Sequence, residues 1–470
     1  MIYSSFDYVF LFLPIMLAFF FGLGRWLPYP GRLMILLLGS FYFYTHWMPI
    51  FLPLLIWTIL FNFFYGRFLY QHNGGKIPLA IGVCVVLLPL LFFKYTNFII
   101  ANINALIGLI QPEYSIARLP LILPLGISFF TFQAIAYLVD CSRKDVENYS
   151  FLELSVFIAF WPQLIAGPIL HHSELIPQLR QPGQNRIQTD NLIAGASLFI
   201  IGAAKKLLIA DALAPMANYG FADPRGIASG AAILAAFCYT FQLYFDFSGY
   251  CDMAYGSARM FNIELPFNFL SPYKSRNMQE FWRHWHITLS RWLRDYIYIP
   301  LGGSRRSEKR TVVNLFLTFL IGGIWHGAGW TFVAWGILHG FSVACCHVWA
   351  KRRRPLPGIV SWGITMAVLI LGWIFFRANT IQDALILCRK IVWWQTFLTD
   401  TPLAKPAIQL CVFSAATVIV APNSKEILQD ITAGKRPWLW GLLLGLLLPL
   451  IILSLLSKSL PPSPFLYFQF

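Results

Sequence analysis

Long apolar runs recur along the whole chain and are separated by short polar connections. Runs of about 20 apolar residues suit helices that cross a hydrocarbon core about 30 Å thick. The alternation of polar and apolar residues that marks a membrane barrel strand is absent, so helices remain as the spanning elements. The pattern predicts an all-α, polytopic membrane protein with roughly 10–12 membrane-embedded helices, including interfacial and re-entrant ones.

Most of the expected helices are continuous apolar segments, namely 6–24, 33–48, 50–66, 77–93, 119–139, 230–247, 358–376, 406–421 and 437–457. Two other segments are expected to differ from a plain crossing. Residues 151–170 contain Trp161-Pro162 and Gly167-Pro168, and proline lacks a backbone donor, so we expect a broken or re-entrant helix. Residues 191–216 carry Lys205 and Lys206, whose ammonium groups are costly at the bilayer centre, so we expect this helix partly in the interface.

The composition agrees with a membrane protein. The chain is 58% hydrophobic and 12% charged, whereas soluble proteins carry about 25% charged residues. We expect one membrane domain over residues 1–470. Its net charge of +15 is attributed to basic loops that set orientation and contact anionic lipid headgroups. No motif of a nucleic-acid-binding fold is visible, so no nucleic-acid partner is expected. The eight cysteines form no C-x-x-C pair and are expected to be buried thiols.

Polar and basic side chains are concentrated in residues 273–340, which we expect to be the catalytic core segment. Residues 280–297 fit one interfacial helix with an aromatic face; the face consists of Phe281, Trp285, Leu289, Trp292 and Tyr296. Between Lys274 and Arg310 there are nine basic and three acidic residues, which predicts a cytoplasmic location. This basic segment either orients the protein in the membrane and contacts lipid headgroups, or forms a basic rim on the protein surface that attracts a phosphate-bearing donor.

Residues between Arg310 and Lys351 are expected to form a helical hairpin. Its 40 residues give about 60 Å of helix, which matches two crossings. Gly327-Ala328-Gly329 interrupts the segment near its middle and places His326 deep in the membrane. A buried neutral imidazole is a competent general base, although it can equally serve helix packing. Trp325 and Trp330 are expected to line a cavity around it.

Other polar residues leave alternatives open. Asp246 and Asp252 lie in or beside a membrane segment, and each is a functional group or half of an ion pair with an arginine. His171 and His172 lie in a loop without Asp, Glu or Cys at ligand spacing, so no metal site is predicted. The chain lacks the nucleophile-elbow, P-loop, dinucleotide-binding and H-E-x-x-H motifs.

Six segments together resemble the membrane-bound O-acyltransferase (MBOAT) family, in particular the bacterial branch that O-acetylates exported polysaccharides such as alginate. They are Tyr244–Tyr250, Pro266–Phe269, Phe281–Ser290, Leu293–Tyr296, Pro300–Gly303 and Gly323–Phe332. The resemblance implies an MBOAT fold, His326 and His286 as catalytic residues, and no metal. The substrate-binding residues would be Asp246, Trp282, Arg294, Trp325 and Trp330.

The resemblance also implies the substrates and the setting of the reaction. The donor would be acetyl-CoA or another acyl thioester from the cytoplasm, with no bound cofactor. The acceptor would be an exported polysaccharide hydroxyl or a periplasmic acyl-relay partner. Further partners would be periplasmic or membrane-anchored acetyltransferases, and the location would be the bacterial inner membrane.

Two other functions stay open at this level. The chain could transport a polysaccharide or an acyl intermediate, because broken segments also occur in transporters, although no internal repeat supports this reading. It could also be a scaffold of an export or modification complex. The sequence does not name the polymer.

Overall fold

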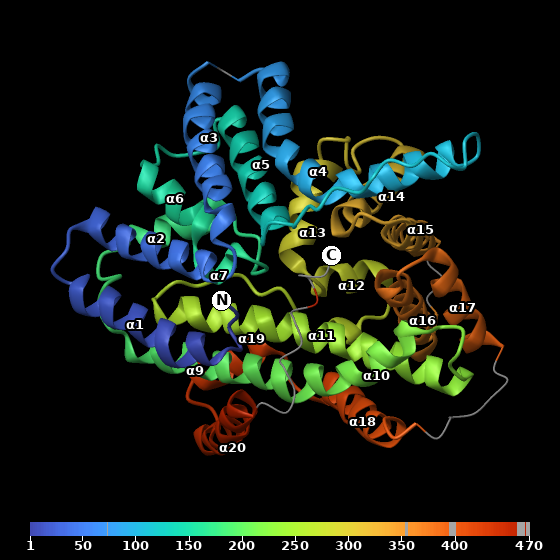
Figure 1. The fold of residues 1–470 in the computed structure, drawn as a ribbon. Coiled ribbons are helices and arrows are strands. Elements are labelled where there is room, and N and C mark those ends of the chain that lie inside the picture. The colour runs from blue at the N-terminus through green and yellow to red at the C-terminus, as the bar shows by residue number, and fades with distance from the viewer. Residues whose placement is uncertain (73, 353–355, 394–400, 458–465, 467–470) are drawn as a thin grey trace. The chain divides into compact units, whose positions relative to one another are not determined.

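The computed structural model describes residues 1–470 except 73, 353–355, 394–400, 458–465 and 467–470 (Figure 1). Across this described part every regular element is a helix. Seven helices are long and apolar enough to cross a membrane, or eight if a bent pair is counted as one span. The expectation of an all-α polytopic protein is therefore confirmed. The residues form two compact units, which are described in turn.

The first unit comprises Met1, Asp7–Gln188 and Phe261–Leu265. Its helices are η1 (Asp7–Phe12), α1 (Leu13–Ala18), η2 (Phe19–Leu23), α2 (Tyr29–Thr45), η3 (Pro49–Phe51), α3 (Leu52–Gln71), α4 (Lys76–Ile107), α5 (Ile127–Arg143), α6 (Phe151–Ala159), α7 (Trp161–Leu164) and α8 (His172–Leu179). Helix α5 packs between α3 and the long α4 (Figure 1).

Helix α5 begins later than the sequence indicates. The expected start at residue 119 is wrong, because the segment 119–126 is not helical. Pro120 and Pro124 lack the backbone donors of a helix. Gly126 has φ +72°, and a Cβ there would lie 2.6 Å from the Leu164 carbonyl oxygen. The left-handed backbone conformation of Gly126 thus allows the chain to turn into α5.

The broken helix expected over residues 151–170 is confirmed. Helix α6 ends at Ala159, and the short α7 starts at Trp161 with Pro162 in its first turn. Proline is tolerated there, because the first amides of a helix have no intrahelical acceptor. Ser150 and Glu153 begin α6 as a capping box.

The second unit comprises Ile2–Phe6, Thr189–Met260 and Pro266–Phe470, where described. Its helices are α9 (Thr189–Ala204), η4 (Lys205–Ala210), α10 (Asp211–Ala222), α11 (Ser229–Met260), η5 (Pro272–Lys274), α12 (Met278–His284), α13 (Ile287–Leu293), η6 (Arg294–Tyr298), α14 (Glu308–His326), α15 (Trp330–Lys351), α16 (Gly358–Arg377), α17 (Ile381–Val392), α18 (Ala404–Val420), α19 (Ser424–Thr432) and α20 (Pro437–Leu456).

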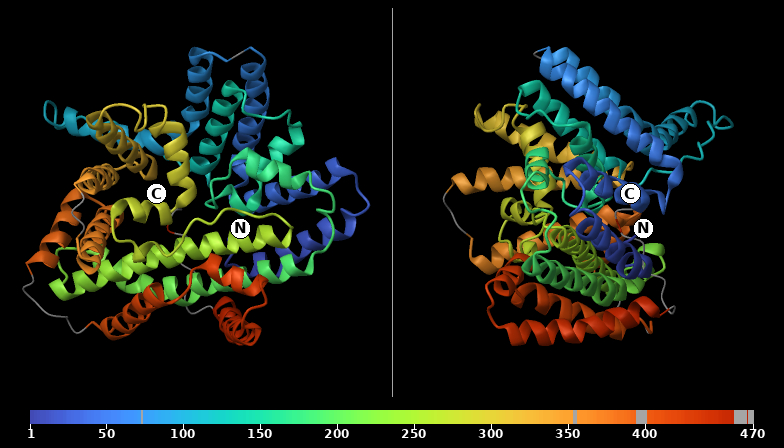
Figure 2. Two further views of the ribbon diagram at one scale, coloured as in Figure 1. Left: turned by 180° about the vertical axis from the view of Figure 1, so that it is seen from behind. Right: turned by 90° about the vertical axis from the view of Figure 1, so that its left-hand side faces the viewer.

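Helices α9 and α11 run side by side in the second unit (Figures 1 and 2). Glycines spaced seven residues apart on each helix bring the backbones together. A Cβ on Gly202 would lie 2.6 Å from the Gly249 carbonyl oxygen, and a Cβ on Gly195 would lie 2.6 Å from that of Gly256. Small residues at such contacts let membrane helices approach closely.

The close contact continues into η4 and α10, which follow α9, and their charges pair with those of α11. Lys205 Nζ lies 2.6 Å from Asp252 Oδ2. Lys206 Nζ lies 2.6 Å from Asp246 Oδ1 and 2.8 Å from Asp211 Oδ1. These ammonium groups are compensated, and Thr189–Ala222 is long and apolar enough to cross the membrane. The interfacial placement expected for residues 191–216 stays a prediction. The partners of Asp246 and Asp252 are lysines rather than the expected arginine.

The prediction of a single helix over residues 280–297 is also wrong. The segment is divided into α12, α13 and η6, and His286 at the first break has φ +41°. Asn268 holds the second piece, because its Oδ1 accepts from the backbone N–H and the hydroxyl of Thr288 at 3.0 and 2.8 Å. The aromatic face is nevertheless largely buried, with Phe281 and Trp285 at most 1% exposed.

Candidate active site

The candidate active site is built on the hairpin of α14 and α15, whose existence the sequence predicted. A Cβ on Gly323 would lie 2.5 Å from the Phe332 carbonyl oxygen, and one on Gly336 would lie 2.9 Å from that of Phe319. These glycines bring the two helices into backbone contact. Helix α15 is among the candidate spans, whereas α14, which starts with charged residues, is not.

His326 is the last residue of α14, directly before the extended Gly327. It is 6% exposed. Its imidazole ring meets aromatic rings edge-on, with centroid distances of 4.9 Å to Trp325, 4.9 Å to Trp335 and 5.2 Å to Phe376. A Cβ on Gly327 would lie 2.1 Å from the Phe332 ring, so only glycine leaves room for this turn. An imidazole is thus held at a helix end in an apolar, aromatic environment.

A second histidine, His339, shares this environment and was not predicted. It is fully buried, and its ring lies 4.4 Å from the Trp335 ring. Trp335 therefore contacts both His326 and His339. The indole N–H of Trp282 donates to His339 Nδ1 at 3.3 Å. Trp335 and His339 are four residues apart on one helix, and this spacing could have indicated from the sequence that their side chains are neighbours.

His286 lies at the start of α13 and is also fully buried. Its ring packs edge-on against Phe247 at 4.8 Å. Burial lowers the pKa of His286 to about 3, so the imidazole is neutral at physiological pH. Although an interfacial helix was expected over residues 280–297, this side chain lies in the protein interior, at the break that follows α12.

The predicted tryptophans differ in their surroundings. Trp282 and Trp325 are each 6% exposed and belong to the aromatic cluster. Trp330 is 58% exposed, which does not fit the expected role of lining a cavity around His326. Trp335 and Phe376 take that position instead.

Comparison with known proteins identifies the family. The model of the membrane-bound O-acyltransferase family matches residues 38–381. The chain belongs to the membrane-bound O-acyltransferase family. It is 38% identical over 517 aligned residues to a peptidoglycan O-acetyltransferase of Helicobacter pylori, covering 98% of this chain and 96% of the relative. It is 36% identical over 499 aligned residues to a probable alginate O-acetylase of Pseudomonas putida, covering both chains fully.

A more distant relative is named for a different polymer, teichoic acid. A teichoic acid D-alanyltransferase of Streptococcus thermophilus is 26% identical over 314 aligned residues, covering 64% of this chain and 71% of the relative. The region that matches the family, residues 38–381, contains the α14–α15 hairpin and both predicted catalytic histidines. The chain is thus a multi-pass membrane O-acyltransferase.

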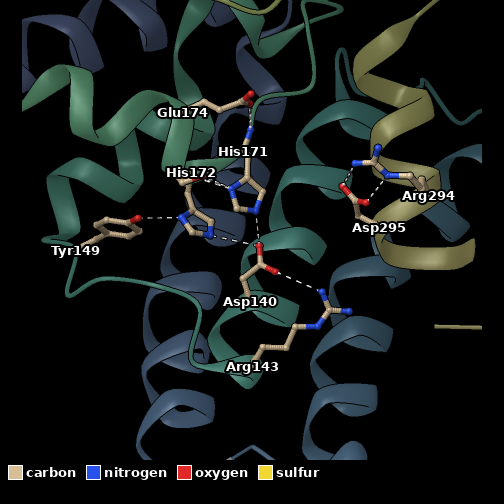
Figure 3. Close-up of polar contacts among 9 residues, drawn as sticks. Asp140, Arg143, Tyr149, His171, His172, Glu174, Arg294 and Asp295 are labelled. Atoms are coloured by element: carbon tan, nitrogen blue, oxygen red, sulfur yellow. Dashed lines mark hydrogen bonds and ion pairs between the residues drawn. The ribbon is translucent and has the colours of Figure 1, made fainter. Parts of the chain in front are cut away.

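Two predicted substrate-binding residues of this O-acyltransferase are held by neighbouring charges. Asp246 is 1% exposed; besides its contact with Lys206, its Oδ2 accepts from the backbone N–H of Leu466 at 3.0 Å. Arg294 contacts Asp295 through two hydrogen bonds of 2.7 and 3.0 Å (Figure 3). Their roles in substrate binding stay predictions.

A polar pocket of about 460 Å³ lies in the second unit of the O-acyltransferase. It is formed by the segments before and within α12 and by α19. The residues lining it are Leu270, Ser271, Lys274, Ser275, Glu280, His284, Asn423, Lys425, Glu426 and Gln429. His284, for which the sequence indicated no role, is among them. The pocket offers lysine, glutamate and neutral hydrogen-bonding groups to a polar ligand.

No metal site was predicted at His171 and His172, because no Asp, Glu or Cys accompanies them in the chain at ligand spacing. In the structure a carboxylate comes from 31 residues earlier. Asp140 Oδ2 lies 2.7 Å from His171 Nε2 and 3.3 Å from His172 Nε2. The premise that no acidic ligand accompanies the pair is therefore wrong.

Proposed function

We propose that this enzyme transfers a short acyl group, acetyl in the simplest case, from a cytoplasmic thioester such as acetyl-CoA. The acceptor is a hydroxyl group of an exported polysaccharide or of a periplasmic relay partner. The names of the two relatives matched over nearly their whole length, a peptidoglycan O-acetyltransferase and a probable alginate O-acetylase, support an acetyl group and a polymer outside the cytoplasm. The enclosed position of His326 beside the Gly327 turn carries the proposal.

In this proposal the imidazole of His326 removes the proton from the acceptor hydroxyl. The oxygen then attacks the thioester carbonyl, the new C–O bond forms, and the C–S bond breaks. The proton returns from the imidazolium to the leaving thiolate, which leaves as a thiol. Aromatic rings around His326 limit access of water, which would otherwise hydrolyse the thioester.

His286 acts as the second polar group of the reaction in this proposal. Because burial keeps its imidazole neutral, one ring nitrogen can donate and the other can accept a hydrogen bond. Trp282 binds His339 and packs against Trp335, so it holds the rings that surround His326 in place.

The polar pocket near α19 is the proposed contact for the charged part of the donor. Lys274, Lys425 and His284 line it together with Glu280 and Glu426, and the segment 274–310 as a whole carries an excess of positive charge. Coenzyme A carries several phosphate charges, which such groups attract. We expect Lys425→Ala to raise the KM for acetyl-CoA several-fold with little change in kcat. Lys435→Ala, an exposed lysine outside this lining, is the control; an equal effect of both would contradict a specific contact.

The decisive test of the function replaces His326. Cells that depend on the His326→Ala variant are compared with wild type by mass spectrometry of their surface polymers. We expect acetylation to fall by a factor of about 100 or more, as removal of a general base does. His347→Ala, a half-buried histidine on α15, is the matched control. Normal acetylation by His326→Ala at normal protein level would refute the assignment.

Further proposed partners follow from the acceptor. We propose the bacterial inner membrane as the location, because it separates the cytoplasmic donor from a polymer outside the cytoplasm. Partner acetyltransferases, periplasmic or membrane-anchored, would receive the acyl group where the polymer itself does not reach His326. Turnover of labelled acetyl-CoA by the purified protein with a soluble polysaccharide fragment, in the absence of partners, distinguishes direct transfer from a relay.

A further inference from the structure

A cluster of two imidazoles and one carboxylate lies in the first unit, separate in sequence from the catalytic core segment (Figure 3). Asp140 comes from the last turn of α5, His171 precedes α8, and His172 is the first residue of α8. One candidate ligand atom from each side chain lies within 4.8 Å of the others. One ligand atom from each of the three side chains is therefore close enough to the others to share one ion.

The surroundings fix the orientation of both rings. The hydroxyl of Tyr149 lies 2.9 Å from His172 Nδ1, and the hydroxyl of Ser173 lies 2.6 Å from His171 Nδ1. Each ring thus uses its Nδ1 for an outer partner and turns its Nε2 toward Asp140. Histidines that bind metals donate their other ring N–H to such an outer partner, and His172 can do so to the Tyr149 hydroxyl. His171 Nδ1 instead accepts from the backbone N–H of Ser173 at 3.4 Å, so metal binding through its Nε2 requires this contact to be released.

Burial and backbone contacts make the cluster rigid. The side chains of Asp140 and His172 are 3% and 2% exposed, whereas that of His171 is 28% exposed. The backbone N–H of His171 donates to Glu174 Oε2 at 2.9 Å, which completes the capping box of α8. A ligand can therefore reach the cluster past His171, while the other two groups are held inside.

The distances fit a small metal ion. Zinc binds imidazole nitrogen at about 2.0–2.1 Å and carboxylate oxygen at about 2.0–2.2 Å, so tetrahedral ligands lie about 3.3–3.5 Å apart. His172 Nε2 and Asp140 Oδ2 are separated by 3.3 Å. His171 Nε2 is 2.7 Å from the same oxygen, which is a hydrogen-bond distance, so this ring must move away from the carboxylate when an ion binds. Magnesium and calcium prefer oxygen ligands, so the two nitrogens select a first-row transition metal.

We propose that Asp140, His171 and His172 form a binding site for a divalent transition metal, with zinc as the preferred ion. Three protein ligands leave a fourth position for water or another ligand. The ion ties the end of α5 to the start of α8 and thereby fixes the intervening segment, which contains the broken helix α6–α7. Arg143, whose Nη1 lies 3.9 Å from Asp140 Oδ1, contacts the carboxylate oxygen that faces away from the histidines.

Metal binding is tested on the full-length protein in detergent. The protein is treated with a chelator, dialysed and titrated with Zn²⁺ and then with Mg²⁺ by calorimetry. We expect one equivalent of Zn²⁺ to bind, Mg²⁺ not to bind, and Zn²⁺ to raise the melting temperature. Absence of Zn²⁺ binding, or equal binding of Mg²⁺, would overturn the proposal.

Variants locate the site. The double variant His171→Ala/His172→Ala should lose this binding, whereas His72→Ala, which removes an exposed histidine of the same unit, should bind as wild type. Unchanged affinity in the double variant would overturn the proposal. If that variant does not fold, Zn²⁺ binding is measured on the variant Tyr149→Phe, which removes the hydroxyl that contacts His172 Nδ1. Loss of the outer hydrogen bond should weaken Zn²⁺ binding about 10- to 100-fold, and an unchanged affinity would again refute the site.

Discussion

His286 links the stability of the enzyme to pH at the level of one residue. An exposed histidine has a pKa of about 6.5, and burial lowers the pKa of His286 to about 3 in the folded state. Between these values the unfolded chain binds a proton that the folded chain does not. The free energy of unfolding therefore falls as the pH drops from about 6.5 toward 3.

We expect the melting temperature in detergent to fall between pH 7 and pH 5, and His286→Gln to weaken this dependence, because glutamine does not titrate. His72→Gln, at an exposed position, should keep the wild-type dependence. An identical pH profile for wild type and His286→Gln would contradict the assignment.

Lys206 is the other single residue with a large expected effect. Its ammonium group lies between the carboxylates of Asp246 and Asp211, and its side chain is 3% exposed. Removing one partner of a buried ion pair leaves uncompensated charge and typically costs about 3–5 kcal/mol. We expect Lys206→Met to lower the melting temperature strongly and Lys405→Met, at an exposed site, to leave it unchanged. Equal melting temperatures for both variants would contradict the compensating role of Lys206.

At the level of elements, glycines decide how closely helices pack. A Cβ on Gly249 of α11 would lie 2.6 Å from the Gly202 carbonyl oxygen of α9, whereas a Cβ on Gly445 of α20 meets no atom within 4 Å. Gly249→Ala should therefore destabilise the protein by about 1–3 kcal/mol through overpacking. Gly445→Ala should stabilise its helix by up to about 1 kcal/mol, since alanine favours helix over glycine. Thermal unfolding in detergent measures both, and a change of the same sign would contradict the packing argument.

Local patterns made some elements predictable. The hairpin around His326 follows from two basic borders and a glycine-rich break, which are neighbours in the sequence. The division at His286 does not, because it depends on hydrogen bonds between Asn268 and Thr288, which are 20 residues apart. The pairing of Lys205 with Asp252 and the approach of Asp140 to His171 are equally non-local. The sequence thus predicted a buried His326, but neither its contact with Trp335 nor the contact of Trp335 with His339.

For the whole molecule, the distribution of basic residues predicts the orientation in the membrane. The segment 274–310 carries an excess of positive charge and should face the cytoplasm. Cysteine introduced at the exposed Ser304, after replacement of the exposed Cys84 and Cys345 by serine, reports its side. We expect a membrane-impermeant maleimide to label it in inverted vesicles but not in intact cells. Labelling in intact cells would reverse the orientation and with it the proposed side of donor entry.

The ion pairs between α9–α10 and α11 also have a consequence for biosynthesis. A lysine or aspartate at the centre of a single inserting helix costs about 2.5–3.5 kcal/mol. Lys205 and Lys206 belong to the segment Thr189–Ala222, and their partners Asp252 and Asp246 belong to Ser229–Met260. Neither segment has its charges fully compensated before the other has been synthesised. The two should leave the insertion machinery for the lipid together, so a nascent chain that ends before Ser229 should be retained there or degraded.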